Sequence, residues 1–115
     1  MPHHEPARRP DDLGRLFIER ANAGDVDGLV ALYEPEALLA LADGSAARGA
    51  AEIRAFFEQL VDGRPVLALG DQQPSLVTGE LALTSTRLVG GGATAEIARR
   101  QPDGSWLWIA DQPNL

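Results

Sequence analysis

The chain of 115 residues contains no cysteine. Disulfides, a thiolate nucleophile and a cysteine-ligated metal are therefore excluded, and we expect a cytoplasmic protein. No stretch reaches the roughly 18 consecutive apolar residues that a membrane-spanning helix needs, so we expect no membrane partner. The segment 1–12 lacks the apolar core of a secretory signal, which agrees with that location.

Lysine is also missing, because all ten basic residues are arginines, and the net charge is −7. Nucleic-acid binding requires clustered basic side chains, so we expect no nucleic-acid partner. No glycine-rich loop follows a strand and opens a helix, which removes support for nucleotide binding. Both histidines lie within residues 1–4, so a Ser-His-Asp set is excluded, and no motif indicates a metal or another cofactor.

Of the 115 residues, 44% are apolar, which is enough for one packed domain. We expect this domain to span residues 11–115. Residues 1–10 contain three prolines and two arginines, and they predict a mobile tail. Adjacent histidines on such a tail make a poor metal site, so we expect His3 and His4 to be solvated.

Three segments carry apolar residues at helical spacing. Asp11 or Asp12 can cap the first helix, within 11–25, and Asp25 can cap a short second helix that places Tyr33 on its apolar face and ends before Pro35. The third helix is expected within 49–63. The expected apolar stripes are Leu13, Leu16, Phe17 and Ala21; Val26, Leu29 and Val30; and Ile53, Phe56, Phe57 and Leu60.

Strand patterns occupy most of the second half of the chain. A short apolar run at 36–43 predicts one strand, and from residue 65 onward the apolar period changes to two. The expected strands are 65–79, interrupted near Pro74, then 80–89, 93–101 and 105–111. Helices grouped apart from antiparallel strands indicate an α+β fold, with the sheet folded over the helices.

Three stretches carry a resemblance to a known superfamily: ANAGDVDGLVALYEPEALL, RGAAEIRAFFEQL and DGSWLWIADQP. They resemble the helix-turn-helix, the third helix and the closing strand of nuclear transport factor 2, ketosteroid isomerase and the SnoaL-like polyketide cyclases. The resemblance implies a cystatin-like, cone-shaped fold, in which a curved mixed or antiparallel sheet wraps three helices around an apolar pocket. It also implies a homodimer that packs through the outer sheet face. Isomerases, cyclases, dehydratases, hydrolases and non-catalytic binders share this fold, so it does not select an activity.

The resemblance also suggests where acid–base groups would lie. The position of the isomerase tyrosine is occupied by Phe17, and that of the base by Leu41, so steroid-type isomerisation by that apparatus is not expected. Asp43 can replace the base only if the register shifts, and beside Gly44 it is more typical of a turn. The third role, a protonated acid, corresponds to Glu96.

Glu96 has two alternative orientations on its strand. If it faces inward with Thr94 and Ala98, its carboxyl lies in apolar surroundings, its pKa rises, and it can serve as a general acid. If it faces outward, it can pair with Arg87 across the strands and Ile97 lies inside. The sequence leaves both alternatives open.

Asp111 is the leading candidate for proton transfer. Strand alternation predicts that Leu107, Ile109 and Asp111 share one face and that Trp108 lies on the other. The resemblance points the Leu107 face into the pocket, and SnoaL-like cyclases likewise carry an acid on a late strand. The alternative is that Asp111 caps the following turn or pairs with an arginine.

The expected function is the binding of a small hydrophobic ligand, with cofactor-free isomerase- or cyclase-type acid–base chemistry by Asp111 and Glu96. The alternative is a non-catalytic binding or dimerisation module with a residual pocket. The expected ligand-binding residues are Phe17, Tyr33, Leu41, Phe56, Phe57, Leu107 and Ile109.

Overall fold

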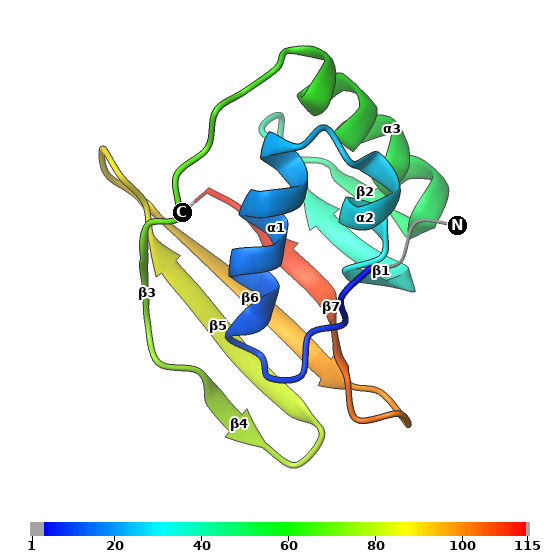
Figure 1. Cartoon of the computed structure of the whole chain (residues 1–115), viewed down its shortest axis with the longest axis vertical. Coiled ribbons are helices and arrows are strands. Elements are labelled where there is room, and N and C mark those ends of the chain that lie inside the picture. The colour runs from blue at the N-terminus through cyan, green and yellow to red at the C-terminus, as the bar shows by residue number, and fades with distance from the viewer. Residues whose placement is uncertain (1–3, 115) are drawn as a thin grey trace.

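The computed structural model describes residues 4–114, in which three helices pack against a curved, seven-stranded sheet (Figure 1). The helices are α1 (Asp12–Asn22), α2 (Val26–Val30) and α3 (Gly49–Asp62). The strands are β1 (Tyr33–Ala40), β2 (Ala46–Arg48), β3 (Asp71–Gln72), β4 (Leu76–Thr78), β5 (Leu81–Arg87), β6 (Ala93–Arg100) and β7 (Trp106–Gln112). None of the described helices has the length and hydropathy of a bilayer-spanning segment.

The sheet is mixed and open, which confirms the expected α+β class. Its strand order is β2-β1-β7-β6-β5-β3, and β4 pairs with β5. β1 and β7 run parallel, and the other pairs are antiparallel. The parallel pair brings the start of the first strand beside the last strand, so residues far apart in sequence meet at the middle of the sheet (Figure 1).

The helix starts follow local hydrogen bonding. Asp25 caps α2 as expected, because its Oδ1 accepts the backbone N–H of Gly28 at 2.9 Å. Gly24, with φ of +70°, provides the left-handed residue that separates α1 from α2. The carboxylate of Asp12 instead accepts two backbone N–H groups of the preceding turn, and Asp11 makes no side-chain cap. Asp12, one of the two acids expected to cap α1, therefore holds the chain segment that leads into the helix.

The second helix is shorter than expected. It ends at Val30, and Tyr33 begins β1, so the prediction that Tyr33 completes a helical stripe is wrong. Pro35 lies inside this strand, and the pairing of β1 with β7 shifts register between Tyr33 and Leu38. Because proline has no N–H to donate to the ladder, an irregular pairing is the way that a strand accommodates it.

The segment expected to be a mobile tail packs against the domain over residues 4–10. Ala7 is buried, and its carbonyl accepts the backbone N–H of Trp106 at 2.9 Å. His4 is also held, because its Nε2 lies 2.9 Å from Oδ2 of Asp25. The tail prediction is therefore wrong for this segment, while residues 1–3, including His3, lie outside the described residues.

The strand expected over 65–79 is largely absent, and only β3 and β4 form within it. The irregular part is tied to α1 instead: Asn22 donates its side-chain amide to the carbonyl of Leu67 at 2.8 Å and accepts that residue's N–H at 2.7 Å. At Gly70 the backbone approaches β5 so closely that a Cβ atom would lie 2.2 Å from the carbonyl oxygen of Arg87. These two contacts hold the segment over one side of the sheet.

The core lies between the helices and the inner sheet face. Phe57 is its largest fully buried side chain, at 1% exposure, and its ring contacts Phe17 and Tyr33 at centroid distances of 5.8 and 5.7 Å. Phe56, its neighbour in sequence, is only partly buried. Of these two adjacent rings on α3, only that of Phe57 is therefore fully buried in the core.

Replacing the buried ring tests this packing. We expect Phe57→Ala to lower the free energy of unfolding by about 3–5 kcal/mol, because it removes apolar contacts and leaves a cavity. The matched variant Phe56→Ala should lose clearly less, since its ring is partly exposed. Urea denaturation measures both values, and equal losses would contradict the packing described above.

Candidate functional site

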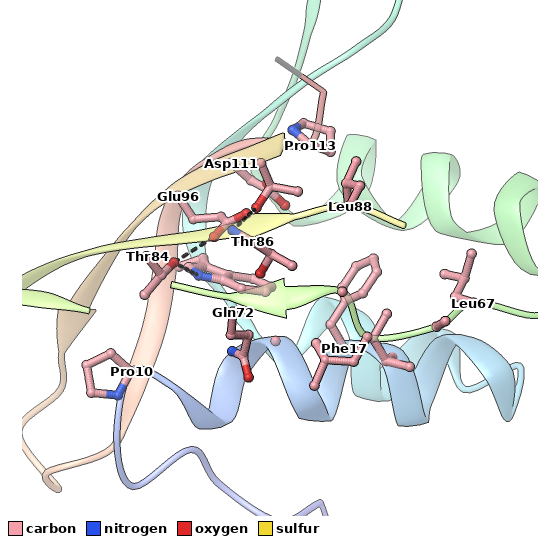
Figure 2. A pocket seen from close by; sticks show the side chains of 17 residues that line it. Pro10, Phe17, Leu67, Gln72, Thr84, Thr86, Leu88, Glu96, Asp111 and Pro113 are labelled. Atoms are coloured by element: carbon pink, nitrogen blue, oxygen red, sulfur yellow. Dashed lines mark hydrogen bonds between the residues drawn. The ribbon is translucent and has the colours of Figure 1, made fainter. Parts of the chain in front are cut away.

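An apolar pocket of about 190 Å³ opens between α1, the segment that leads into β3, and the inner face of β5, β6 and β7 (Figure 2). Its apolar lining comprises Pro10, Phe17, Ile18, Leu67, Ala68, Leu69, Leu88, Trp108 and Pro113. The remaining lining residues are Gly14, Gly70, Gln72, Thr84, Thr86, Thr94, Glu96 and Asp111. Apolar walls with a few convergent polar groups are the usual make-up of a small-molecule site.

A β-bulge in β7 sets the direction of the side chains at this site. Along the β6–β7 pair, Ile97 faces Ala110, but the next residue, Ala98, faces Trp108. Ile109 is therefore one extra residue on β7, which is the definition of a bulge. The bulge interrupts strict alternation at this point of the strand.

The bulge brings Trp108 and Asp111 to the same inner face, although three positions separate them. The predicted inward orientation of Asp111 is correct, but the predicted outward orientation of Trp108 is wrong. Leu107 and Ile109 were expected to line the pocket, and neither does. Because each residue of a regular strand points opposite to its neighbour, one inserted residue is enough to exchange the faces.

Asp111 is buried at 8% exposure and accepts a 2.5 Å hydrogen bond on Oδ2 from the hydroxyl of Tyr33. Burial raises the pKa of the Asp111 carboxyl to about 7; the Tyr33 hydrogen bond opposes the rise, and the charge of Glu96 adds to it. Burial, together with the neighbouring acid, holds the pKa of Tyr33 well above its usual value. At neutral pH Tyr33 is therefore a neutral donor, and Asp111 populates both protonation states.

Glu96 lies directly opposite Asp111 in the β6–β7 pair and adopts the inward orientation. The hydroxyl of Thr84 donates to Oε1 of Glu96 at 2.6 Å, and Nε1 of Trp108 donates to that hydroxyl at 3.4 Å. Burial raises the pKa of Glu96, while the hydroxyls of Thr84 and Thr94 oppose the rise. The floor of the pocket thus carries two adjacent carboxyls, each with a defined donor. Figure 2 shows both carboxyls and the Thr84 donor of Glu96.

The other residues predicted for ligand binding are divided between the pocket and the core. Phe17 lines the pocket from α1. Tyr33 and Phe57 lie in the core beneath it, and Tyr33 contacts the lining residues Asp111 and Trp108 from below. Leu41 and Phe56 pack against the core elsewhere and do not line the pocket.

Sequence reasoning missed Thr84 and Thr86, and it placed Thr94 beside Glu96 only in the inward alternative. Thr84 and Thr86 lie two apart on β5, and Thr94 lies two before Glu96 on β6, so all four share the inner face. The period-two spacing of these polar residues was visible in the sequence. It becomes informative only when the two strands are paired in register.

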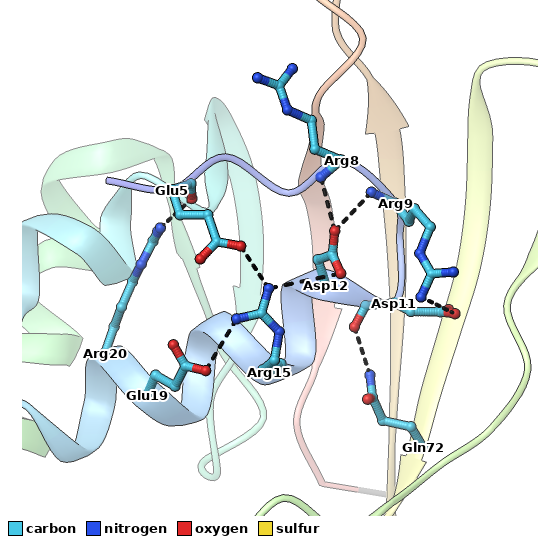
Figure 3. A network of polar contacts seen from close by, with 9 residues as sticks. All are labelled: Glu5, Arg8, Arg9, Asp11, Asp12, Arg15, Glu19, Arg20 and Gln72. Atoms are coloured by element: carbon cyan, nitrogen blue, oxygen red, sulfur yellow. Dashed lines mark hydrogen bonds and ion pairs between the residues drawn. The ribbon is translucent and has the colours of Figure 1, made fainter. Parts of the chain in front are cut away.

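α1 separates the pocket from a charged surface (Figure 3). Arg15 contacts Glu5 at 2.7 Å and Glu19 at 3.1 Å on this surface. Gln72 of β3 donates to the carbonyl of Asp11 at 3.0 Å and so ties β3 to the start of α1 beside the pocket. None of the arginines of this network lines the pocket, and among the described residues the lining contains no basic side chain.

The remaining candidates lie outside the pocket. Asp43 is exposed and accepts the N–H and the hydroxyl of Ser45, so it is a turn residue. Within residues 4–114, no group of three or more histidines and acids has a geometry that could hold a metal ion.

The raised pKa of Asp111 predicts the pH dependence of stability. In the unfolded chain an aspartate loses its proton near about pH 4, whereas Asp111 in the fold keeps it until about pH 7. Between these values the folded state binds one proton more, so this carboxyl lowers the free energy of unfolding by up to roughly 1.4 kcal/mol for each unit of rising pH. Urea denaturation at intervals between pH 4.5 and 6.5 measures the slope.

Asp111→Asn provides the comparison, because its amide oxygen still accepts from Tyr33 but has no proton to lose. We expect the variant to lack this part of the slope. Asp43→Asn, in the exposed turn, should keep it. If wild type and Asp111→Asn have the same slope, the acid is not buried in the way described.

Comparison with known proteins supports the fold. A protein from Thiobacillus denitrificans, named as a calcium/calmodulin-dependent protein kinase type II association domain, superposes with a TM-score of 0.76 at 13% identity, over 99% of this chain and 100% of that one. A nuclear transport factor 2-like protein with a cystatin-like fold from Novosphingobium aromaticivorans gives 0.66 at 22%, over 87% and 75%. No curated protein matches the sequence. The family model of the SnoaL-like domain matches residues 15–111, and the chain therefore belongs to the SnoaL-like domain family.

Proposed function

We propose that the chain binds a small hydrophobic molecule in the pocket between α1 and the sheet and transfers a proton on it without a cofactor. One observation carries the proposal: Glu96 and Asp111 lie opposite each other at the polar end of an otherwise apolar pocket. Family membership supports small-molecule binding in general terms. The reaction class rests on the chemistry of the two acids.

The pair of carboxyls supplies both an acid and a base. With a pKa of about 7, Asp111 exchanges a proton readily near neutral pH, which is the range in which general acid–base catalysis is most effective. Because Glu96 is adjacent, the two groups titrate as a pair, and near neutral pH Asp111 is present in both its protonated and its ionised form. The ionised carboxyl would take a proton from a carbon next to a carbonyl group, and the protonated carboxyl would return one at another position.

Neighbouring side chains hold the two carboxyls in fixed orientations. Tyr33 holds Oδ2 of Asp111, and Thr84 holds Oε1 of Glu96, so neither carboxyl rotates freely. Phe17 and Trp108 form apolar walls above them. The donors on the two acids are a tyrosine from β1 and a threonine from β5, an arrangement different from that of ketosteroid isomerase.

Proton exchange on a simple ketone tests this proposal. We expect the protein to speed the incorporation of deuterium next to the carbonyl of cyclohexanone in heavy water, followed by proton NMR. Asp111→Asn and Glu96→Gln should each lower the protein-dependent rate by about 10²-fold or more, because each removes one proton-transfer group. Glu58→Gln, on the exposed surface of α3, should leave the rate unchanged. Unchanged rates in both pocket variants would contradict the catalytic role.

A second candidate function is assembly, and it rests on the outer face of the sheet. Leu83 and Ile97 are 46% and 41% exposed there, in a shallow groove whose other apolar members are Leu38, Ala40, Ala46, Ala95 and Ala110. Charged pairs lie beyond them, including Arg99 with Glu34 at 2.9 Å. An apolar centre within a charged rim suits the symmetric contact of a homodimer, so we propose a second copy of the chain as its partner.

Sedimentation velocity tests the homodimer. We expect wild type to sediment as a dimer and Ile97→Lys as a monomer, because the variant places a charge at the centre of the apolar face. Val66→Lys is the matched control, since Val66 is 93% exposed and lies outside this groove. A monomeric wild type, or a dimer that survives Ile97→Lys, would contradict assembly through this face.

A further inference from the structure

The charge of the pocket points to the chemistry of its ligand. Two acids line it, and the described lining contains no arginine, lysine or histidine. Within residues 4–114, Oδ1 of Asp111 makes no hydrogen bond, whereas Oδ2 is held by Tyr33. A buried carboxylate is stable only with a donor or a positive charge beside it. The protein supplies Tyr33 as a donor to Asp111 and threonine hydroxyls as donors to Glu96, and the described lining supplies no cation.

The size of the pocket limits the ligand further. A cavity of roughly 150 Å³ holds a benzene molecule, so the volume of about 190 Å³ found here suits one ring with a short substituent. At the same degree of filling as the benzene cavity, a second fused ring would have to extend out of the pocket. The apolar walls above the acids can pack against the ring, and the carboxyls can hydrogen-bond a polar substituent.

We propose that the ligand is a single-ring amine, bound as its ammonium ion between the carboxyls of Glu96 and Asp111. This inference rests on the binding part of the proposed function, because it names a ligand class for the same pocket; as a bound cation, the amine is not the carbonyl substrate of the proposed proton transfer. The ammonium group has three N–H donors, and Oδ1 of Asp111, Glu96 and the hydroxyl of Thr86 lie at the polar end to accept them.

The aromatic walls favour the same charge. Phe17 and Trp108 both line the pocket, with ring centroids 6.1 Å apart. Aromatic faces attract cations, and this attraction is stronger where water is excluded. An anion would meet two acids and two aromatic rings without a compensating positive charge.

The pH dependence of binding separates an amine from a neutral ligand. The titratable groups that face Asp111 are Tyr33 from β1 and Glu96 from β6. α1 contributes Gly14, Phe17 and Ile18 to the lining and β5 contributes threonines, none of which carries a charge. Below pH 7 an ammonium ion must displace the proton of the pair, so its affinity rises with pH. A carbonyl ligand needs that proton as a donor, so its affinity falls.

The experiment compares three probes of similar shape: benzylamine, benzyl alcohol and benzoate. We expect the dissociation constant of benzylamine to fall by about tenfold from pH 5.5 to 6.5, because binding displaces up to one proton while an aliphatic ammonium keeps its charge. Benzoate should bind at least about tenfold more weakly than benzylamine at pH 7.5, which corresponds to one uncompensated charge in the pocket.

The two tryptophans provide an internal reference for the binding measurement by NMR. Trp108 lines the pocket, so its indole N–H signal should move on titration, whereas Trp106 lies beside the N-terminal segment and should not respond.

Asp111→Asn should remove the pH dependence of benzylamine binding, and Glu58→Gln should retain it. 1-Naphthylmethylamine, with a second ring, should bind at least about tenfold more weakly, given the volume limit.

The outcomes distinguish this inference from the function on which it rests. If benzyl alcohol binds as tightly as benzylamine, or the affinity of benzylamine does not rise with pH, the amine is wrong, while proton exchange on cyclohexanone still decides the catalytic proposal. If no probe moves the Trp108 signal, the amine inference is overturned. The pH series uses the wild-type protein, so it stands even if Asp111→Asn fails to fold.

Discussion

The extra residue at Ile109 is the constraint on which the site depends. In a regular strand, residues three apart point to opposite faces, so Trp108 and Asp111 share the pocket only because the bulge lies between them. Once Asp111 faces inward, the parallel pairing of β7 with β1 brings Tyr33 to one side of it, and the antiparallel pairing with β6 brings Glu96 to the other. One local irregularity thus positions a hydrogen bond, an acid pair and an aromatic wall.

The site also illustrates how a fold tolerates buried acids. Burial disfavours the ionised form of both carboxyls, and their proximity disfavours two charges at once. Tyr33 and Thr84 offset part of this cost by donating to one oxygen of each. The result is a pair that holds a proton near neutral pH, which is unfavourable for stability and useful for chemistry.

Much of the fold follows from local sequence signals, but the orientation of the site does not. The apolar spacing of α1 and α3 and the Asp25 cap of α2 identify the three helices, because each signal is read within a few residues. The predicted orientation of Leu107 and Ile109 was wrong because the alternation of apolar residues in the sequence does not reveal a bulge. The packing of Ala7 was missed because it depends on a carbonyl contact with Trp106, 99 positions later in the chain.

The attachment of the pocket's outer wall has a consequence for how the shape of this pocket can be altered. The side chain of Asn22 hydrogen-bonds both the N–H and the carbonyl of Leu67, so the backbone of this wall is held without using the wall's own side chains. Substitutions of Leu67, Ala68 and Leu69 therefore change the apolar wall while the path of the backbone stays fixed. Such substitutions leave the acids at the floor untouched, because Glu96 and Asp111 are carried by β6 and β7.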